Sequence, residues 1–360
     1  MAASPLSAAR SIVVFRALML GDWLCATPAL RALRAAAPHA RIALCGLPWT
    51  AALAQRLPMV DDFLPFPGHP ALPEQAPGAG SLNEFFARAH VRRFDLALQM
   101  HGSGGVVNDI VAALGARTTA GFAVPGTEKG LDIVCPWPDR GHEIDRCLAL
   151  AAALGAPSRG RALEFRLQDE DRRVARSLLT AAGIHGRYVV VHPGAQLPSR
   201  RWSPARFARV ADALAEAGWQ VVVTGSAGEA ELARAVCAAM RHPAANLCGR
   251  TPSLWTLGAL VADATLVVAN DTGVSHVVAA LRTSSVIVAS GSDVERWAPL
   301  DRACHRVHWH ATACRPCAHA TCPTAHECAD GVPADAVIAS AFDLLEHHIP
   351  CQTPLADSVS

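Results

Sequence analysis

Short apolar runs alternate with longer, alanine-rich stretches through the first half of the chain. The apolar runs read SIVVF, RIALCG and FDLALQM and lie at 11–15, 41–46 and 94–100. Helical stretches are predicted after them at 26–37, 49–57 and 106–114. These strands are apolar at consecutive rather than alternate positions, which is typical of a parallel sheet with helices on both faces.

The same alternation begins again at residue 188. Strands are predicted at 188–192, 219–225, 264–270 and 284–290, with helices at 204–218, 229–240 and 274–281. Gly218 is the expected C-terminal cap of the first of these helices. The sequence thus predicts two doubly wound α/β units of Rossmann size, joined within 155–187. The expected domains are 1–165 and 166–345, followed by a C-terminal tail at 346–360.

Composition narrows the class of protein. The chain has 360 residues, 51% of them hydrophobic, and a net charge of +1, which favours two folded domains over a disordered chain. Basic and acidic residues number 14 and 12 up to residue 160 and 18 and 19 beyond it, so no nucleic-acid partner is expected. Lys129 is the only lysine, and no Gly-Lys-Ser/Thr triplet of a P-loop exists.

The sequence contains no feature that predicts insertion into a membrane. No apolar stretch reaches about 18 residues, the length that crosses a bilayer. The opening ten residues lack the basic start and apolar core of a signal peptide. A cytoplasmic protein is therefore expected. The Pro- and Gly-rich segment at 65–81 is either a functional lid or a solvated insertion.

A first candidate site directly follows the strand at 11–15, in the segment RALMLGDWLCATPAL. Ligands of open α/β sheets bind at the carboxyl ends of the strands. Gly21 is expected to allow a tight turn, with Asp22 before a helix that begins around Thr27 and Pro28. Asp22 is either a functional carboxylate or a turn or capping residue. The segment lacks GxGxxG, which disfavours a dinucleotide-dependent oxidoreductase.

A second candidate site is NDTGVSHVVAAL at 270–281, where a strand end meets a helix start. The backbone N–H groups of 272–276 are expected to point out of the helix N-terminus and to offer an anion site for a phosphate or diphosphate. His276 in the first turn can donate to the same oxygens. Alternatively, Asp271 is a plain N-cap and His276 a packed core residue.

Two further segments follow predicted strands. HPGAQLPSRRWSP begins at His192 and carries Arg200 and Arg201, which either clamp a diphosphate or are surface charges. TGSAGEAE at 224–231 offers Glu229 or Glu231 as an acceptor for a ribose hydroxyl, although helix-capping acids have the same pattern.

In combination and order, these four segments resemble glycosyltransferase family 9, the ADP-heptose:lipopolysaccharide heptosyltransferases, over nearly the whole chain. The opening R-x4-G-D-x4-T-P-A-L-R-A-L-R and the late N-D-T-G-x-S-H-x2-A-A-L are the more specific of the shared motifs. The resemblance implies a GT-B fold, in which two Rossmann-like domains face each other across a cleft. It places the acceptor on the N-terminal domain and the nucleotide-sugar on the C-terminal domain.

The resemblance also implies roles for single residues. Asp22 corresponds to the general base that deprotonates the acceptor hydroxyl, with Arg16 and Gly21 in support. The donor sugar, its phosphates and its ribose are assigned to Arg200, Asp271, Thr272, Gly273, His276 and Glu229, supported by His192 and Arg201. Arg200 stands where the family usually has lysine, and Trp202-Ser203-Pro204 has one residue more than the family's Trp-Pro.

The resemblance therefore predicts an inverting transferase that moves a heptose from ADP-heptose to a lipopolysaccharide inner-core acceptor without a metal. Its acceptor is lipid-anchored, so peripheral contact with the cytoplasmic face of the inner membrane is expected. One alternative is a family 9 transferase with another nucleotide-sugar or acceptor, for capsule or O-antigen. The other is a non-catalytic sugar-nucleotide-binding protein.

Twelve cysteines in a chain expected to be cytoplasmic favour free thiols or a metal site over a disulfide framework. Cys314, Cys317, Cys322 and Cys328 form one cluster, whose alternatives are reduced structural thiols, a structural zinc site and disulfides. The segment CRPCAHATCPTAHEC resembles a stretch found late in some second-heptose transferases, where catalysis needs no metal. The other eight cysteines are expected to be small core hydrophobes.

Overall fold

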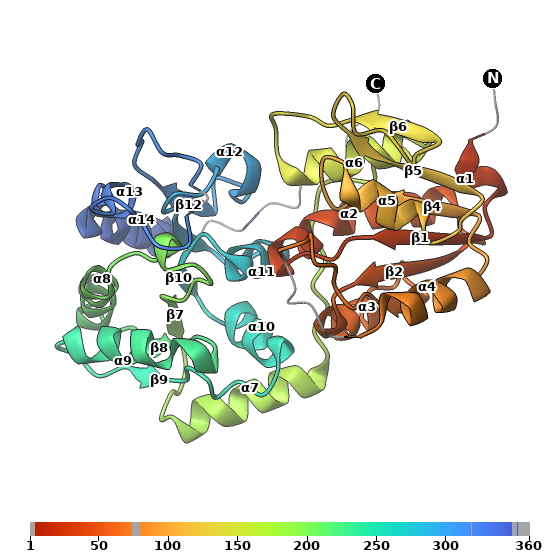
Figure 1. Cartoon of the computed structure of the whole chain (residues 1–360). Helices are drawn as coiled ribbons and strands as arrows, with labels where there is room; N and C mark the ends of the chain where they lie inside the picture. The colour runs from red at the N-terminus through yellow and green to blue at the C-terminus, as the bar shows by residue number, and fades with distance from the viewer. Residues whose placement is uncertain (1–3, 74–79, 318, 348–350, 352–360) are drawn as a thin grey trace. The chain divides into compact units, whose positions relative to one another are not determined.

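The computed structural model describes residues 4–73, 80–317, 319–347 and 351. The described residues fold as two compact units, residues 4–166 and 167–351. Each unit is built on a six-stranded sheet, all of whose strand pairs are parallel, with helices on both faces (Figure 1). Of the tail predicted at 346–360, only residues 346, 347 and 351 are described.

The sheet of the first unit has the strand order β3-β2-β1-β4-β5-β6. Its strands are β1 (Ser11–Phe15), β2 (Arg41–Gly46), β3 (Asp62–Pro65), β4 (Leu96–Gln99), β5 (Thr118–Ala123) and β6 (Ile133–Pro136). Its helices are α1 (Pro5–Ala8), α2 (Leu20–Ala36), η1 (Pro48–Thr50), α3 (Ala51–Gln55), α4 (Leu82–Val91), α5 (Val106–Ala112) and α6 (Glu143–Ala153).

The sheet of the second unit has the order β12-β11-β10-β7-β8-β9. Its strands are β7 (Tyr188–His192), β8 (Gln220–Val223), β9 (Ala245–Asn246), β10 (Leu266–Asn270), β11 (Ser285–Val288) and β12 (His305–His308). Its helices are α7 (Asp169–Ala181), η2 (Pro198–Arg200), α8 (Pro204–Glu216), η3 (Ala227–Glu229), α9 (Ala230–Ala239), α10 (Leu254–Ala262), α11 (Gly273–Leu281), α12 (Val294–Trp297), α13 (Glu327–Asp330) and α14 (Ala334–His347).

Both sheets have the strand order of a Rossmann fold, so the predicted fold class is confirmed. Each order reverses where the first and fourth strands of the unit pair, β1 with β4 and β7 with β10. Strands β7 and β10 are buried along their whole length, which explains why each is apolar up to its last residue, His192 or Asn270. Ligands of such sheets bind beyond the carboxyl ends of the strands at this reversal point, which is where Arg16 and Asp271 lie.

Helix α2 differs from the prediction in where it begins. It starts at Leu20 rather than around Thr27, and Pro28 lies inside it. Proline has no N–H to donate to the carbonyl four residues earlier, but the Thr27 hydroxyl donates to that Leu24 carbonyl at 2.7 Å. The neighbouring threonine therefore supplies the missing donor. As a consequence, Asp22 lies in the first turn of a helix, and the buried Gly21 is helical rather than the corner of a turn.

The second unit is anchored by Trp202, which is completely buried. Its ring packs edge-on against Phe207 at 5.0 Å, and its indole N–H donates to the Val332 carbonyl at 3.2 Å. This side chain holds the segment that carries Arg200 against the core.

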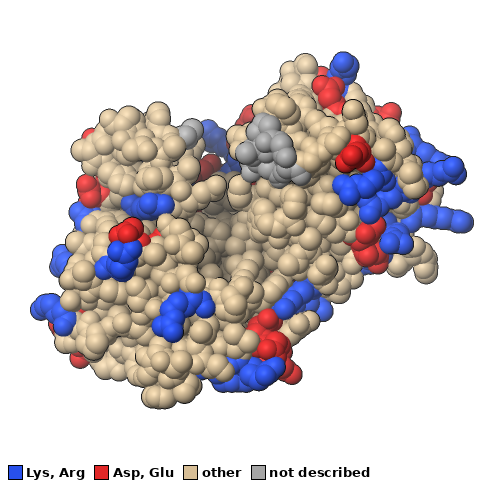
Figure 2. All heavy atoms as spheres, turned by 60° about the horizontal axis from the view of Figure 1, so that its bottom comes forward, with Lys and Arg blue, Asp and Glu red and all other residues tan. Residues whose placement is uncertain are grey.

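None of the helices among the described residues combines the length and the apolar character needed to cross a bilayer. On the face shown in Figure 2, basic and acidic side chains are interspersed, with no continuous basic stripe of the kind that tracks a phosphate backbone.

Candidate functional site

The carboxyl edge of the first unit's sheet carries a buried ion-pair network around Arg16. The Arg16 side chain, 3% exposed, donates to Glu143 Oε1 at 2.9 Å and to the main-chain carbonyl of Asp22 at 2.8 Å. The Asp22 carboxylate lies 3.8 Å from the same guanidinium and is 21% exposed. Glu143 is therefore the closer counter-ion, and Asp22 keeps a partly accessible carboxylate beside a fixed cation.

Glu143 is held in this network from two sides. It is the first residue of α6, whose N-cap His142 accepts from the Ile144 N–H at 3.1 Å. Arg146, one turn later, lies 3.4 Å from the second Glu143 oxygen. Burial acts to lower the pKa of Arg16, but Cys147, Glu143 and Asp22 together raise it above its ordinary value. Arg16 is therefore a permanent cation in the fold.

Sequence reasoning missed Glu143, although it is the principal partner of Arg16. The two residues are 127 positions apart, and no motif spacing connects them. A glutamate followed by an arginine three residues later on a helix is also a common surface pattern. Only the packing of α6 against α2 reveals the pair.

The second unit gathers three of the predicted segments at one sheet edge through Asn270. The Asn270 side chain accepts from the main-chain N–H of Trp202 at 3.0 Å and donates to the Pro193 carbonyl at 2.7 Å. It thereby ties the loop after β7 and the Arg200–Trp202 segment to the end of β10, directly before Asp271. The sequence did not single out Asn270 by itself.

Asp271 is not the N-cap of α11, which is the position of Thr272. One Asp271 oxygen accepts from the Ser275 hydroxyl at 3.2 Å, while the other is buried without a hydrogen-bond partner. Gly273 begins the helix, and the Ser275 N–H already donates to the Thr272 carbonyl. His276 is buried, with its ring edge-on to Trp297 at 6.0 Å.

The two neighbouring arginines have different partners. Arg200 donates to the Cys317 carbonyl, while Arg201 Nε donates to the Ala195 carbonyl at 2.9 Å and so braces the loop after β7. Arg315, which the sequence analysis did not select, interacts electrostatically with both Arg200 and Asp271. Arg302 also interacts electrostatically with Asp271, so the positive charge at this edge comes from Arg200, Arg302 and Arg315, with Arg201 in a bracing position.

His192 is the last residue of β7, and Glu229 is the last residue of η3, which follows β8. A Cβ atom on Gly194 would lie 2.3 Å from Glu229 Oε1, so the carboxylate lies directly against the loop after β7. Its other oxygen accepts from the Ser226 N–H at 2.7 Å. Glu231, the other candidate, is exposed and paired with Arg234. His192 Nδ1 lies 3.0 Å from the Thr224 hydroxyl, and burial lowers the pKa of this histidine.

The cysteine cluster does not converge as a metal site in this structure. No three of the sulfurs of Cys314, Cys317, Cys322 and Cys328 lie within 4.8 Å of one another, so zinc there stays a prediction. Cys304 and Cys351 instead form a disulfide beside His305. The prediction that the other eight cysteines are core hydrophobes is therefore wrong for this pair. Cys304 directly precedes β12, and its disulfide partner Cys351 lies 47 residues later in the sequence.

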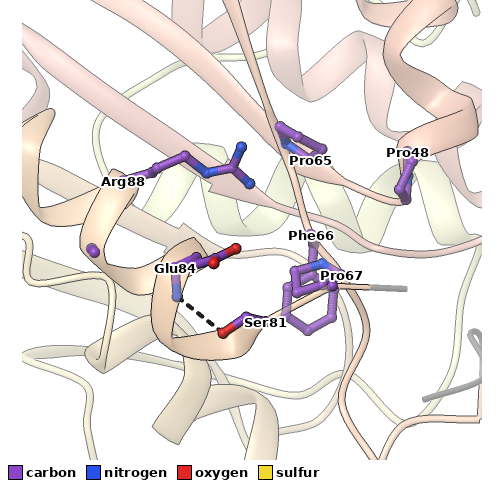
Figure 3. A pocket seen from close by; sticks show the side chains of 9 residues that line it. Pro48, Pro65, Phe66, Pro67, Ser81, Glu84 and Arg88 are labelled. Carbon is purple, nitrogen blue, oxygen red and sulfur yellow. Dashed lines mark hydrogen bonds between the residues drawn. The ribbon is translucent and has the colours of Figure 1, made fainter. Parts of the chain in front are cut away.

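A cavity of about 480 Å³ lies in the first unit, next to the carboxyl end of β3. Arg88 and Glu84 of α4 point toward a wall formed by prolines and Phe66 (Figure 3). The lining residues are Pro48, Pro65, Phe66, Pro67, Gly80, Ser81, Glu84, Ala87 and Arg88. The cavity borders the segment predicted as a lid or insertion, of which residues 74–79 lie outside the described part of the chain.

Known proteins resemble this chain in sequence and in fold. Lipopolysaccharide heptosyltransferase 2 of Escherichia coli (strain K12) is 27% identical over 307 residues, which cover 80% of this chain and 85% of that protein. Lipopolysaccharide heptosyltransferase 3 of the same strain is 28% identical over 161 residues, and the match spans only 46% of its length and 44% of this chain. The solved structure of the ADP-heptose lipopolysaccharide heptosyltransferase II of E. coli superposes with a TM-score of 0.75 at 21% identity, covering 94% of this chain and 99% of that one.

The fold of that structure agrees with the two six-stranded Rossmann-like units and with the GT-B class that the sequence predicted. The family model for glycosyltransferase family 9 (heptosyltransferase) matches residues 91–327, roughly two thirds of the chain. The chain therefore belongs to glycosyltransferase family 9, the heptosyltransferase family, and is a glycosyltransferase.

Proposed function

We propose that this chain transfers a heptose from ADP-heptose to a hydroxyl of the lipopolysaccharide inner core, with inversion at the anomeric carbon. The second unit binds the donor, and the first unit supplies the base. Because the acceptor is lipid-anchored, the reaction takes place at the cytoplasmic face of the inner membrane through peripheral contact.

The observation that carries this proposal is the joining of three loops by Asn270. Its two hydrogen bonds place the loop after β7, the Arg200 segment and Asp271 at one end of the sheet. The N-terminus of α11 and the Arg200 guanidinium then supply partial and full positive charge for a diphosphate. Glu229, against the same loop, offers a carboxylate oxygen to a ribose hydroxyl.

The chemistry assigned to the first unit needs one carboxylate. The acceptor oxygen attacks the anomeric carbon, its proton passes to Asp22, and the bond from the anomeric carbon to the diphosphate oxygen breaks with its electron pair on ADP. Arg16, a permanent cation, lies 3.8 Å from the Asp22 carboxylate and favours its charged form electrostatically. Cations in the second unit stabilise the departing diphosphate, so this scheme requires no metal.

The acceptor side of the proposal rests on the cavity beside β3. Its proline wall offers an apolar surface to a sugar ring, while Glu84 and Arg88 offer an acceptor and a set of donors for hydroxyl or acidic groups (Figure 3). Both side chains come from one face of α4, one turn apart. This combination fits a charged saccharide better than a purely apolar ligand.

Calorimetric titration with ADP, UDP, GDP and CMP, each with and without EDTA, tests the donor assignment. We expect ADP to bind most tightly, with the same affinity in EDTA, because the proposed diphosphate ligands are arginine and helix N–H groups. A preference for UDP or GDP would favour the family 9 transferase with another nucleotide-sugar. Binding of none of the four would favour a different function for the second unit.

Gly194→Ala tests the role of Glu229. The new methyl group would overlap the Glu229 carboxylate, which must move because its tip is the flexible partner in this contact. We expect ADP affinity to fall about tenfold to a hundredfold, the worth of one charge-assisted hydrogen bond, with the midpoint of thermal unfolding little changed. Gly228→Ala is the matched control, since its Cβ meets only the Ser226 hydroxyl at 4.0 Å. Equal ADP affinities in both variants would show that Glu229 does not bind the ribose of ADP.

A further inference from the structure

Three buried polar atoms without hydrogen-bond partners belong to the segments that follow two neighbouring strands, β10 and β11, at the carboxyl edge of the second sheet. Among the described residues these atoms are Asp271 Oδ2, Ser290 Oγ and Ser292 Oγ. Asp271 follows Asn270, the register partner of Val288 on β11, so Ser290 lies just beyond the end of the neighbouring strand. Buried hydroxyl and carboxylate oxygens are nearly always paired in folded proteins, so a cluster of unpaired ones at a ligand-binding edge indicates a ligand.

The loop that carries the two serines is held in place through its backbone alone. Arg315 Nη1 donates to the Ala289 carbonyl at 2.7 Å, and Arg315 Nη2 donates to the Ser292 carbonyl at 2.6 Å. The Cys317 N–H donates to the Gly291 carbonyl at 2.7 Å. Gly291 has φ +66°, and a Cβ there would lie 2.9 Å from Cys317 Cβ, so glycine is needed for this close approach. The hydroxyls of both serines take no part in this bracing.

The same loop lies between two parts of the proposed donor site. On one side, the Cys317 carbonyl accepts from Arg200. On the other, Asp293 caps α12, and Trp297 of that helix contacts the His276 ring. The cysteine-rich segment thus connects the serine loop to the residue assigned to the diphosphate.

We propose that Ser290 and Ser292 bind hydroxyl groups of the donor's sugar, and that Arg315 is the positioning residue for their loop. This inference rests on the proposed function of the second unit. A serine hydroxyl both donates and accepts, as a sugar hydroxyl does, and turns toward a ligand by rotation about a single bond. The unpaired Asp271 oxygen accepts from a sugar hydroxyl but would repel a phosphate. The three atoms together therefore select the sugar and not the nucleotide.

Titration of Ser290→Ala and Ser292→Ala with ADP-heptose and with ADP separates the two parts of the donor. We expect each variant to bind ADP-heptose about threefold to tenfold more weakly and ADP within twofold of the wild type. The midpoint of thermal unfolding should stay unchanged or rise, because the substitution removes a buried hydroxyl that no protein group pairs. Arg315→Lys keeps the charge but cannot bond both carbonyls, so it should reproduce the selective loss.

Ser285→Ala is the control, on the strand that leads into the same loop. The Ser285 hydroxyl is bonded to His305 Nδ1 at 2.8 Å, so this variant should lower the unfolding midpoint and leave both affinities unchanged. Serine variants that bind ADP-heptose like the wild type, or that lose ADP equally, would overturn the inference. If the wild type prefers another nucleotide-sugar, ADP-heptose is not the donor. The serine variants are then titrated with the preferred nucleotide-sugar and with its free nucleotide, and the same selective loss is expected. A wild type that binds no nucleotide-sugar would overturn both proposals.

Discussion

Asp22→Asn is expected to lower kcat by about 10²- to 10⁴-fold, the usual contribution of a positioned general base. The variant keeps the size and shape of the side chain but cannot accept a proton from the acceptor hydroxyl. The donor ligands proposed above all come from the second unit, so the Kd for ADP should stay within twofold of the wild type. Steady-state kinetics at saturating donor and acceptor, together with ADP titration, measure both quantities.

The position of Asp22 makes this result informative. The carboxylate lies in the first turn of α2, where a negative charge is favourable, and 3.8 Å from Arg16. A merely structural role would make the asparagine variant less stable without a selective loss of kcat. Near-normal turnover would show that Asp22 is not the base, whereas Asp22→Glu should recover part of the activity if it is.

Much of the fold could be predicted because a strand that is covered by helices on both faces of the sheet has a continuous apolar sequence. Strand β7 is apolar at four consecutive positions, and alternation of such runs with helical stretches is typical of a parallel sheet between helix layers. The candidate residues at the strand ends followed from the same pattern, since this edge is where open α/β sheets bind ligands. Asp22, Asp271 and Arg200 could be selected because each lies in the segment that follows a predicted strand, which needs only local sequence.

What the sequence could not predict depends on contacts between distant segments. The Arg16–Glu143 pair joins residues 127 positions apart, and the Cys304–Cys351 disulfide joins residues 47 apart. The strand predicted at 284–290 includes Ser290, whereas β11 ends at Val288. Ser290 therefore lies in the loop whose carbonyls accept from Arg315, a residue 25 positions further along the chain that the strand pattern does not indicate.

Glu143→Gln is expected to lower the free energy of unfolding by about 3–5 kcal/mol, the cost of removing one partner from a buried ion pair. The Glu143 side chain is 3% exposed and accepts from Arg16 at 2.9 Å, with Arg146 at 3.4 Å from its other oxygen. The amide keeps one accepting oxygen but leaves two guanidinium groups without their shared counter-charge. Urea unfolding followed by circular dichroism measures the change in midpoint and slope.

The same substitution should also lower kcat with little change in the Kd for ADP. Without the charge of Glu143, the positive field of Arg16 acts chiefly on Asp22, which stabilises the ionised carboxylate and weakens it as a base. Asp145→Asn is the matched control: it lies two residues along α6, is 48% exposed and pairs with Arg161, so it should cost less than about 1 kcal/mol and leave kcat unchanged. If Glu143→Gln matches this control in both the free energy of unfolding and kcat, the position and charge of Arg16 do not depend on Glu143. The basicity of Asp22 is then determined by Arg16 without any contribution from Glu143.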